Sequence, residues 1–322
     1  MTTGKSIHID ARSSAGRAVQ VFKALGSPTR IAILDSVADR VVPLAQLANE
    51  LKLPASTAAM HISVLERAGL LHTEMRPASR GLQKVCARTY DELIIDLPRG
   101  ARPPTNVIEH DMPIGGYTEI QVSPTCGLAS ATQLIGFLDD PASFYEPDRL
   151  SAQLLWFGSG HVEYRFPNRL PPMAHATMLQ FSAELCSEAP LHDPNWPSDI
   201  TIWVNDVEIG TWTSPGDFGG ERGRYTPTWW ENKDTQYGVL KRWRVTDGGT
   251  SVDGVALSTV TLADLELTTG APIRVRIGVR PDAAHAGGLN LFGREFGNYQ
   301  QDLVLLMEYE AGSSSRGVRK GG

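Results

Sequence analysis

The sequence contains few cysteines and no long apolar run, and each scarcity excludes a class of protein. Its 322 residues include only Cys86, Cys126 and Cys186, which lie far apart, so we expect no disulfide framework. No stretch approaches the roughly 20 consecutive apolar residues that cross a bilayer. The first fifteen residues lack an apolar core of signal-peptide length. We therefore expect a cytoplasmic protein with no membrane partner.

Charge is distributed unevenly along the chain. Residues 1–105 hold 14 Lys and Arg against 9 Asp and Glu, a net charge of +5, whereas residues 106–322 carry −11. All seven tryptophans lie in the acidic part. A basic head can approach a polyanion that an acidic body repels. We expect a flexible N-terminus (1–14), a helical head (15–98), a proline-containing linker (99–112), a β-sandwich (113–310) and a disordered tail (311–322).

Apolar residues recur at helical spacing over residues 15–69 and predict four helices. The second helix opens on Ser27 and Pro28, an N-cap followed by proline in the first turn. The third and fourth helices meet at Leu53 and Pro54, which predicts a helix-turn-helix. Two alternating runs then flank residues 77–81 and predict a β-hairpin, which completes a winged helix.

The surface of the fourth helix and the cations of the hairpin are the expected contacts with double-stranded operator DNA. Such a helix enters the major groove, and hairpin cations meet phosphates. The candidate contacts are Ser56, Thr57, Ala59, Met60, His61 and Ser63 on the helix, with Arg76, Arg80 and Lys84 on the hairpin. His61 lies among apolar neighbours, and its position fits a packed structural residue as well as a phosphate contact.

The runs FKALGSPTRIAILDSV and PLAQLANELKLPASTAAMHISVLERAGLL resemble the ArsR-type winged-helix transcriptional regulators over roughly residues 15–97. The resemblance implies a DNA-binding regulator. The family commonly has polar or basic side chains where Ala55, Ala59 and Met60 stand, which favours methyl contacts with thymine and contacts from the wing. The third helix has no Cys or His, so we expect no metal at the family's usual sites and no cofactor.

Beyond residue 115 the period of the pattern changes to two and predicts an all-β domain, a jelly roll or related sandwich. Asn205 and Asp206 are placed as a hairpin turn. Trp156, Trp203 and Trp243 lie within strand patterns, so we expect them in the core. The predicted strands lie near residues 118–122, 151–157, 161–166, 176–186, 199–213, 238–245, 272–280 and 302–309.

Flat aromatic rings beside carboxylates suit a sugar, which presents C–H faces and a rim of hydroxyls. The candidate ligand contacts are Glu163, Arg165, Glu184, Glu188, Trp196, Asp199, Trp212, Asp217, Trp229 and Trp230. They divide between a polar strand face and tryptophan-rich loops, and the pattern leaves open which of the two forms the pocket.

The second domain resembles the C-terminal domain fused to winged-helix heads in a subgroup of bacterial ArsR-type regulators, through runs such as QLLWFGSGHVEYRFPNRLP and QDLVLLMEYE. The resemblance implies an effector-sensing domain for a sugar or sugar-derived molecule. The leading hypothesis is a homodimeric repressor that is not an enzyme. Two alternatives stay open: a carbohydrate-active enzyme using Glu184 and Glu188, and a sandwich that serves only oligomerisation.

Overall fold

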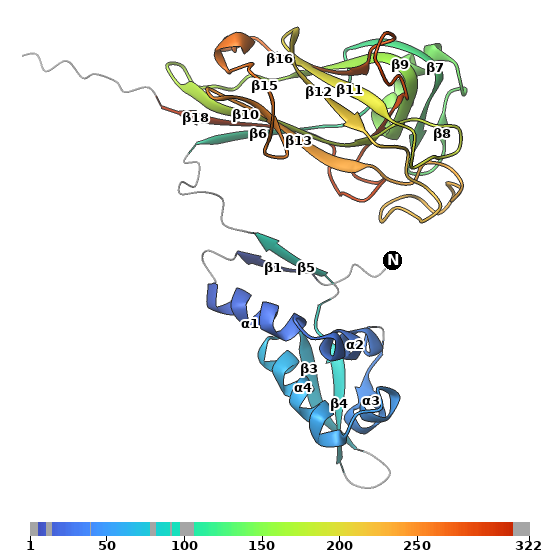
Figure 1. Cartoon of the computed structure of the whole chain (residues 1–322), viewed down its shortest axis with the longest axis vertical. Coiled ribbons are helices and arrows are strands. Elements are labelled where there is room, and N and C mark those ends of the chain that lie inside the picture. Colours follow the sequence, from blue (N-terminus) through green and yellow to red (C-terminus); the bar gives the residue numbers. More distant parts are fainter. Residues whose placement is uncertain are drawn as a thin grey trace, which may run out of the picture. The chain divides into compact units, whose positions relative to one another are not determined.

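The computed structural model describes residues 6–10, 15–38, 40–77, 82–90, 92–96 and 106–311. The chain divides into two compact units, Met1–Pro103 and Pro104–Gly322. Figure 1 shows a first unit of helices and short strands and a second unit built from strands. Among the described residues, no helix combines the length and apolar character needed to cross a membrane.

The first unit is a helix-turn-helix followed by a hairpin. Its helices are α1 (Ala15–Leu25), α2 (Pro28–Ser36), α3 (Leu44–Glu50) and α4 (Ala55–Arg67). The hairpin strands β3 (Leu71–Pro77) and β4 (Leu82–Arg88) form a sheet with β2 (Val42–Pro43), in the order β2-β4-β3. One side chain from each helix, Val21, Ile33, Leu47 and Ile62, is fully or almost fully buried in a shared core. The predicted winged helix is therefore confirmed.

Two further strands in the described part of this unit form a separate small sheet. β1 (Ser6–Asp10) pairs in parallel with β5 (Glu92–Asp96), and β1 contacts α1. Ile7 and Ile9 alternate with polar residues, so both reach the core of the unit, where they are 8% and 2% exposed. The prediction of a flexible N-terminus over residues 1–14 is wrong for residues 6–10. The predicted tail lies outside the described residues from position 312 onward.

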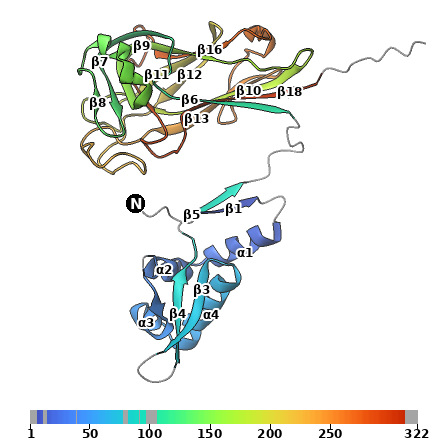
Figure 2. The same ribbon diagram turned by 180° about the vertical axis from the view of Figure 1, so that it is seen from behind.

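Over its described residues 106–311, the second unit forms one sheet of 13 strands that is nearly closed on itself. In its centre, β9 (Ala152–Phe166) pairs along one edge with β7 (Glu119–Ser130). Along its other edge β9 pairs with β16 (Ile273–Val279) and then with β17 (Leu289–Phe292). β17 also pairs with β10 (His175–Cys186) and so joins the two halves of the sheet, which Figure 2 shows from behind.

The remaining strands extend each half. β11 (Ser198–Val204) and β12 (Val207–Ser214) continue from β16, and β13 (Val239–Thr246), β14 (Gly249–Val252) and β15 (Val255–Ser258) continue from β10. β18 (Leu303–Glu310) pairs with β10 and with β6 (Val107–Met112), while β8 (Leu134–Ile135) pairs with β7. Short 3-10 helices η1 (Pro141–Tyr145), η2 (Pro147–Ser151) and η3 (Ala263–Leu265) lie between strands.

Apolar side chains from both halves of the sheet fill its interior. Ile273, Val275, Ile277 and Val279 of β16 are at most 2% exposed, whereas the arginines between them are not buried, which confirms the predicted alternation. Trp243 is fully buried and Trp156 is 9% exposed, as predicted. Trp203 is only half-buried, because the alternation of β11 turns it to the opposite face from Ile202 and Val204.

The predicted strand positions hold, with two corrections. Residues 151–157 and 161–166 belong to one strand, because Gly160 (φ 108°) lets β7 approach so closely that a Cβ there would lie 1.8 Å from the carbonyl oxygen of Gln121. Residues 107–112, predicted as linker, form β6 instead. Asn205 and Asp206 form the predicted turn between β11 and β12. A jelly-roll strand order stays a prediction.

Candidate functional site

α4 presents a row of small and apolar side chains to solvent. Its apolar stripe, Ala58, Ile62 and Leu65, is buried in the core of the first unit. The predicted DNA contacts lie on the rest of the helix: Ser56, Ala59, Met60 and Ser63 are exposed, and Thr57 and His61 are half-buried. The buried Nδ1 atom of His61 has no hydrogen-bond partner among the residues that the structure describes.

The hairpin is joined to α4 through an acidic residue. Lys84 Nζ lies 3.2 Å from Oε2 of Glu66 on α4, and the hydroxyl of Thr73 donates to the other oxygen of the same carboxylate. The bond from Thr73 is the largest effect that lowers the pKa of Glu66. Arg76 pairs with Glu74 on the same strand. Arg80, the third predicted wing contact, lies outside the described residues.

The second unit contains a cavity of about 410 Å³ walled by three tryptophans. We call it the tryptophan cavity. The residues that line it come from β8 and the segment after it, from β9 and β17, from the segment after β10 and from the loop before β13. They are Leu134, Leu138, Leu154, Trp156, Glu188, Ala189, Pro190, Leu191, Trp229, Trp230, Glu231, Asp234, Thr235 and Asn290.

Hydrogen bonds hold the tryptophan walls in place. The indole N–H groups of Trp229 and Trp230 donate to the carbonyl oxygens of Ala131 and Thr235, each at 2.8 Å. The ring of Trp230 packs edge-on against Trp156 (5.9 Å between centroids) and Trp229 (5.4 Å). Such edge-to-face pairs stabilise a fixed ring geometry. The two indoles therefore offer ring surface to the cavity and spend their donors on the protein.

A carboxyl group and a carboxamide meet on the cavity wall. Oε2 of Glu188 accepts a 2.8 Å hydrogen bond from Nδ2 of Asn290, and Oε1 accepts one of 3.2 Å from the hydroxyl of Thr125. Burial, followed by the charge of Asp217, raises the pKa of Glu188 to about 8. At neutral pH this side chain is mostly protonated.

Asp217 lies behind this pair and is fully buried. Its Oδ2 atom accepts hydrogen bonds from the backbone N–H of Ala189 (3.1 Å) and the hydroxyl of Thr235 (2.8 Å). Burial raises the pKa of Asp217 to about 6 against the effect of these two bonds. Asp217 does not line the cavity, but its hydrogen bonds hold Ala189 and Thr235, which do.

The structure places Glu184 outside the cavity. Its carboxylate accepts hydrogen bonds from the backbone N–H groups of Gly238 (2.9 Å), Asn298 (2.8 Å) and Tyr299 (2.9 Å). Burial raises its pKa to about 7 despite these bonds. Glu184 therefore anchors the loop before β18 to the start of β13, and the structure does not bring it together with Glu188 as a catalytic pair would require.

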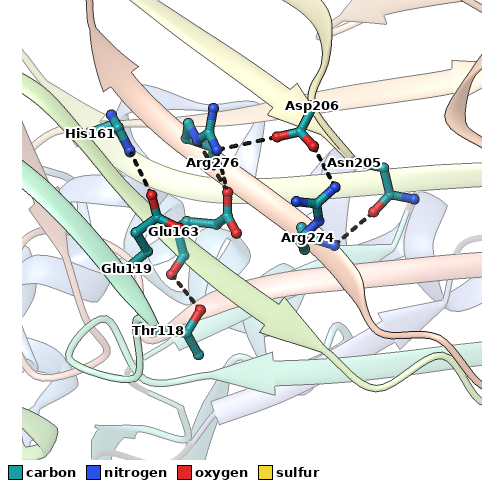
Figure 3. Close-up of polar contacts among 8 residues, drawn as sticks. All are labelled: Thr118, Glu119, His161, Glu163, Asn205, Asp206, Arg274 and Arg276. Atoms are coloured by element: carbon teal, nitrogen blue, oxygen red, sulfur yellow. Dashed lines mark hydrogen bonds and ion pairs between the residues drawn. The ribbon is translucent and has the colours of Figure 1, made fainter.

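The polar strand face is a network of ion pairs rather than an open ligand clamp. Arg276 Nη2 lies 2.7 Å from Oε2 of Glu163, which is 2% exposed, and 3.2 Å from Oδ1 of Asp206 (Figure 3). Asp206 also pairs with Arg274. Because Glu163 has a cationic partner, its burial is compensated within the sheet. Arg165, the other candidate on this face, is exposed.

The last three candidate ligand contacts lie away from the tryptophan cavity and from the ion pairs of the polar strand face. Asp199 accepts hydrogen bonds from the hydroxyl of Thr213 (2.7 Å) and the backbone N–H of His285 (3.0 Å). The ring of Trp212 packs under Lys241 Nζ at 4.7 Å, and Trp196 is 39% exposed. None of the three residues Trp196, Asp199 and Trp212 lines the tryptophan cavity. The structure thus brings Glu188, Trp229 and Trp230 together on the cavity wall, with Asp217 directly behind them, and places the other candidates elsewhere.

Trp156, Thr235 and Asn290 line the cavity but were missed as ligand candidates. Trp156 follows a strand pattern typical of core residues. Asn290 is a single polar residue in the apolar run LNLF, and an amide in such a run is a usable signal because a buried polar group needs a partner. In the described part of the chain, no group of three or more His, Cys, Asp and Glu side chains is placed to hold a metal ion.

Comparison with known proteins finds relatives that each cover a part of this chain. NolR from Sinorhizobium fredii is 25% identical over 24% of this chain and 75% of its own (TM-score 0.22). HlyU from Vibrio cholerae is 25% identical over 24% and 76% (TM-score 0.21). An uncharacterised HTH-type transcriptional regulator of Methanocaldococcus jannaschii is 36% identical over 56 residues, which span less than two thirds of that relative. Residues 25–74 match the family described as a helix-turn-helix domain, and this part of the chain is such a domain.

Proposed function

We propose that this chain is a cytoplasmic, homodimeric, DNA-binding repressor whose all-β unit binds a small sugar or sugar-derived effector. The observation that supports DNA binding most directly is the exposed row on α4, within the helix-turn-helix match and beside the wing. A dimer would place two such helices roughly 34 Å apart, one helical turn of DNA.

The exposed chemistry of α4 suits a particular kind of base contact. Ala59 and Met60 offer methyl groups that pack against thymine, while Ser56 and Ser63 form hydrogen bonds with either donors or acceptors. On the wing, Lys84 and Arg76 would exchange their acidic partners Glu66 and Glu74 for phosphates. Sequence preference then comes from the helix, and most of the affinity comes from the wing.

The tryptophan cavity supports effector binding. Its volume of about 410 Å³ suits a small molecule, and its apolar walls surround a few fixed polar groups. The observation that carries this assignment is the hydrogen-bonded pair of Glu188 and Asn290 beside Trp156, Trp229 and Trp230. Flat rings pack on the C–H faces of a sugar, and the polar pair bonds its hydroxyls.

A sensor fits the second unit better than the two alternatives. A glycosidase needs two carboxyl groups that face one substrate, and three backbone N–H groups already occupy Glu184. A domain that only oligomerises needs no cavity with carboxyl groups on its wall. The effector would release DNA to the extent that it binds one dimer geometry more tightly than the other.

Ligand binding is tested by thermal shift of the full chain against glucose, galactose, xylose and arabinose, with each hit titrated into a protein–DNA complex. The Trp229→Ala variant should show no increase in melting temperature when the sugar is added. Trp196→Ala is the matched control, since the two indoles are 38% and 39% exposed and only Trp229 lines the cavity. Equal loss in both variants, or no shift with any sugar, would count against this effector site.

DNA binding is tested by selecting bound duplexes from a random pool and measuring affinity by fluorescence anisotropy. Met60→Glu should weaken binding at least about tenfold, because it places a negative charge on the groove-facing helix. Met173→Glu, at a residue that is 79% exposed in the second unit, adds the same charge as a control. Unchanged binding by Met60→Glu would remove α4 from the DNA interface.

A further inference from the structure

Four side chains that line the tryptophan cavity have their hydrogen-bond donors occupied by the protein. The indole N–H groups of Trp229 and Trp230 are both bound to carbonyl oxygens. Both hydrogens of the Asn290 amide are engaged, by the carbonyl oxygen of Ser187 (2.7 Å) and by Glu188 (2.8 Å). The hydroxyl of Thr235 donates to Asp217. The donors on these four cavity side chains are therefore occupied by the protein.

The cavity wall also carries hydrogen-bond acceptors that belong to acidic side chains. Glu188, Glu231 and Asp234 line the cavity, and no described lining residue is Lys, Arg or His. Glu231 pairs with Lys233 at 2.7 Å, where both side chains are more than half exposed. The partners of Glu188 are the neutral groups of Asn290 and Thr125. Glu188 is half-buried, and among the described residues its hydrogen-bond partners carry no positive charge that could pair with a carboxylate.

We propose that the effector carries a protonated amine, which binds at Glu188 between the tryptophan walls, so that the ligand class is a hydroxylated amine such as an amino sugar. An ammonium group donates three hydrogen bonds and accepts none, which matches the acidic acceptors of the cavity beside the occupied donors of Trp229, Trp230, Asn290 and Thr235. Indole rings are also the aromatic surfaces that attract a cation best. The inference rests on the proposed effector site and narrows its ligand.

Binding of such a cation should expel a proton. The charged groups that influence Glu188 or line the cavity with it are Asp139, Asp217, Glu231 and Asp234, all acidic, so the unliganded site favours the neutral acid. His192 acts on Asp217 and Asp234, and its Nδ1 atom lies 2.7 Å from the carbonyl oxygen of Lys233. An ammonium beside Glu188 favours the carboxylate, and the displaced proton passes to the buffer. A neutral sugar causes no such exchange.

The test compares glucosamine with glucose, galactosamine with galactose, and mannosamine with mannose on the full chain by titration calorimetry at about pH 6.5, where primary amines stay protonated. Two buffers of different ionisation enthalpy report the protons released. We expect the amines to bind at least about tenfold more tightly than their neutral counterparts and to release close to one proton per site. The comparison within wild-type protein needs no variant to fold.

Glu188→Gln keeps the shape of the side chain. It should abolish both the tighter binding of amino sugars over neutral sugars and the release of a proton on binding. Glu208→Gln is the matched control, because Glu208 is a glutamate paired with Arg280 and does not line the cavity. Neutral sugars that bind as tightly as their amines overturn this inference and leave the proposed sugar site standing. If neither series binds, the inference and the effector site fail together, while DNA binding is unaffected.

Discussion

Asn290 Nδ2 donates to Oε2 of Glu188 at 2.8 Å, across 102 residues of sequence, and joins β17 to the segment that follows β10. The same amide donates to the carbonyl oxygen of Ser187, and Asn290 is 1% exposed. The carboxamide of Asn290 therefore links β17 to the segment after β10 and fixes one wall of the tryptophan cavity.

Asn290→Asp should destabilise the second unit by roughly 2 kcal/mol or more, because it replaces the donor by a third carboxyl beside Glu188 and Asp217. Urea unfolding followed by tryptophan fluorescence measures this change, since all seven tryptophans lie in that unit. Asn195→Asp, at an exposed position, is the control and should change stability little. Similar stability of both variants would contradict the role given to Asn290.

The second unit should lose stability as the pH rises through the neutral range. Burial raises the pKa of Asp217 to about 6, of Glu184 to about 7 and of Glu188 to about 8, so the folded chain holds these protons more tightly than the unfolded chain. Their contribution is complete below the ordinary carboxyl pKa and is lost as the pH rises through these values. Thermal unfolding between about pH 5 and pH 9 should show a falling midpoint.

Glu188→Gln carries no ionisable group at this position and should flatten the upper part of that pH dependence. A midpoint that rises with pH in wild-type protein, or the same slope in the variant, would show that the buried carboxyls are not the cause.

Arg276→Ala should destabilise the second unit by about 3 to 5 kcal/mol, because it leaves Glu163 charged, 2% exposed and without its cationic partner. The double variant Glu163→Gln, Arg276→Met removes both charges and should recover part of the loss. Urea unfolding of the three proteins measures the difference. Arg280→Ala breaks a pair with Glu208 in which both side chains are more than a third exposed, and it should cost less than about 1 kcal/mol. If Arg276→Ala and Arg280→Ala lower the free energy of unfolding equally, the ion pairs of Figure 3 stabilise the second unit no more than an exposed pair does.

Lys84→Ala should weaken DNA binding and reduce the slope of log affinity against log salt by about one. The reason is that the ammonium of Lys84 lies on the wing beside α4 and would exchange Glu66 for a phosphate. Fluorescence anisotropy at several salt concentrations gives the slope. Arg169→Ala removes the same charge from an exposed position of the second unit and should leave the slope unchanged. An unchanged slope in Lys84→Ala would place the wing off the DNA.

Local patterns predicted much of the backbone. The apolar stripe of Ala58, Ile62 and Leu65 predicts α4 and its solvent side, because helical periodicity assigns each residue a face. The alternation from Ile273 to Val279 predicts β16 for the corresponding reason. Short strands such as β14, β15 and β17 were missed, since four residues hold too little periodicity.

The sequence by itself determined the helix-turn-helix, the strands of the acidic part and the separation of charge between them, because each follows from neighbouring residues. Only the tertiary structure decided which acidic residues face a cavity. Glu184 and Glu188 lie four residues apart, yet one is bound by backbone N–H groups and the other lines the tryptophan cavity. Their different positions depend on residues more than 100 positions away, Asn298 in the loop before β18 and Asn290 in β17, and no local pattern encodes such contacts.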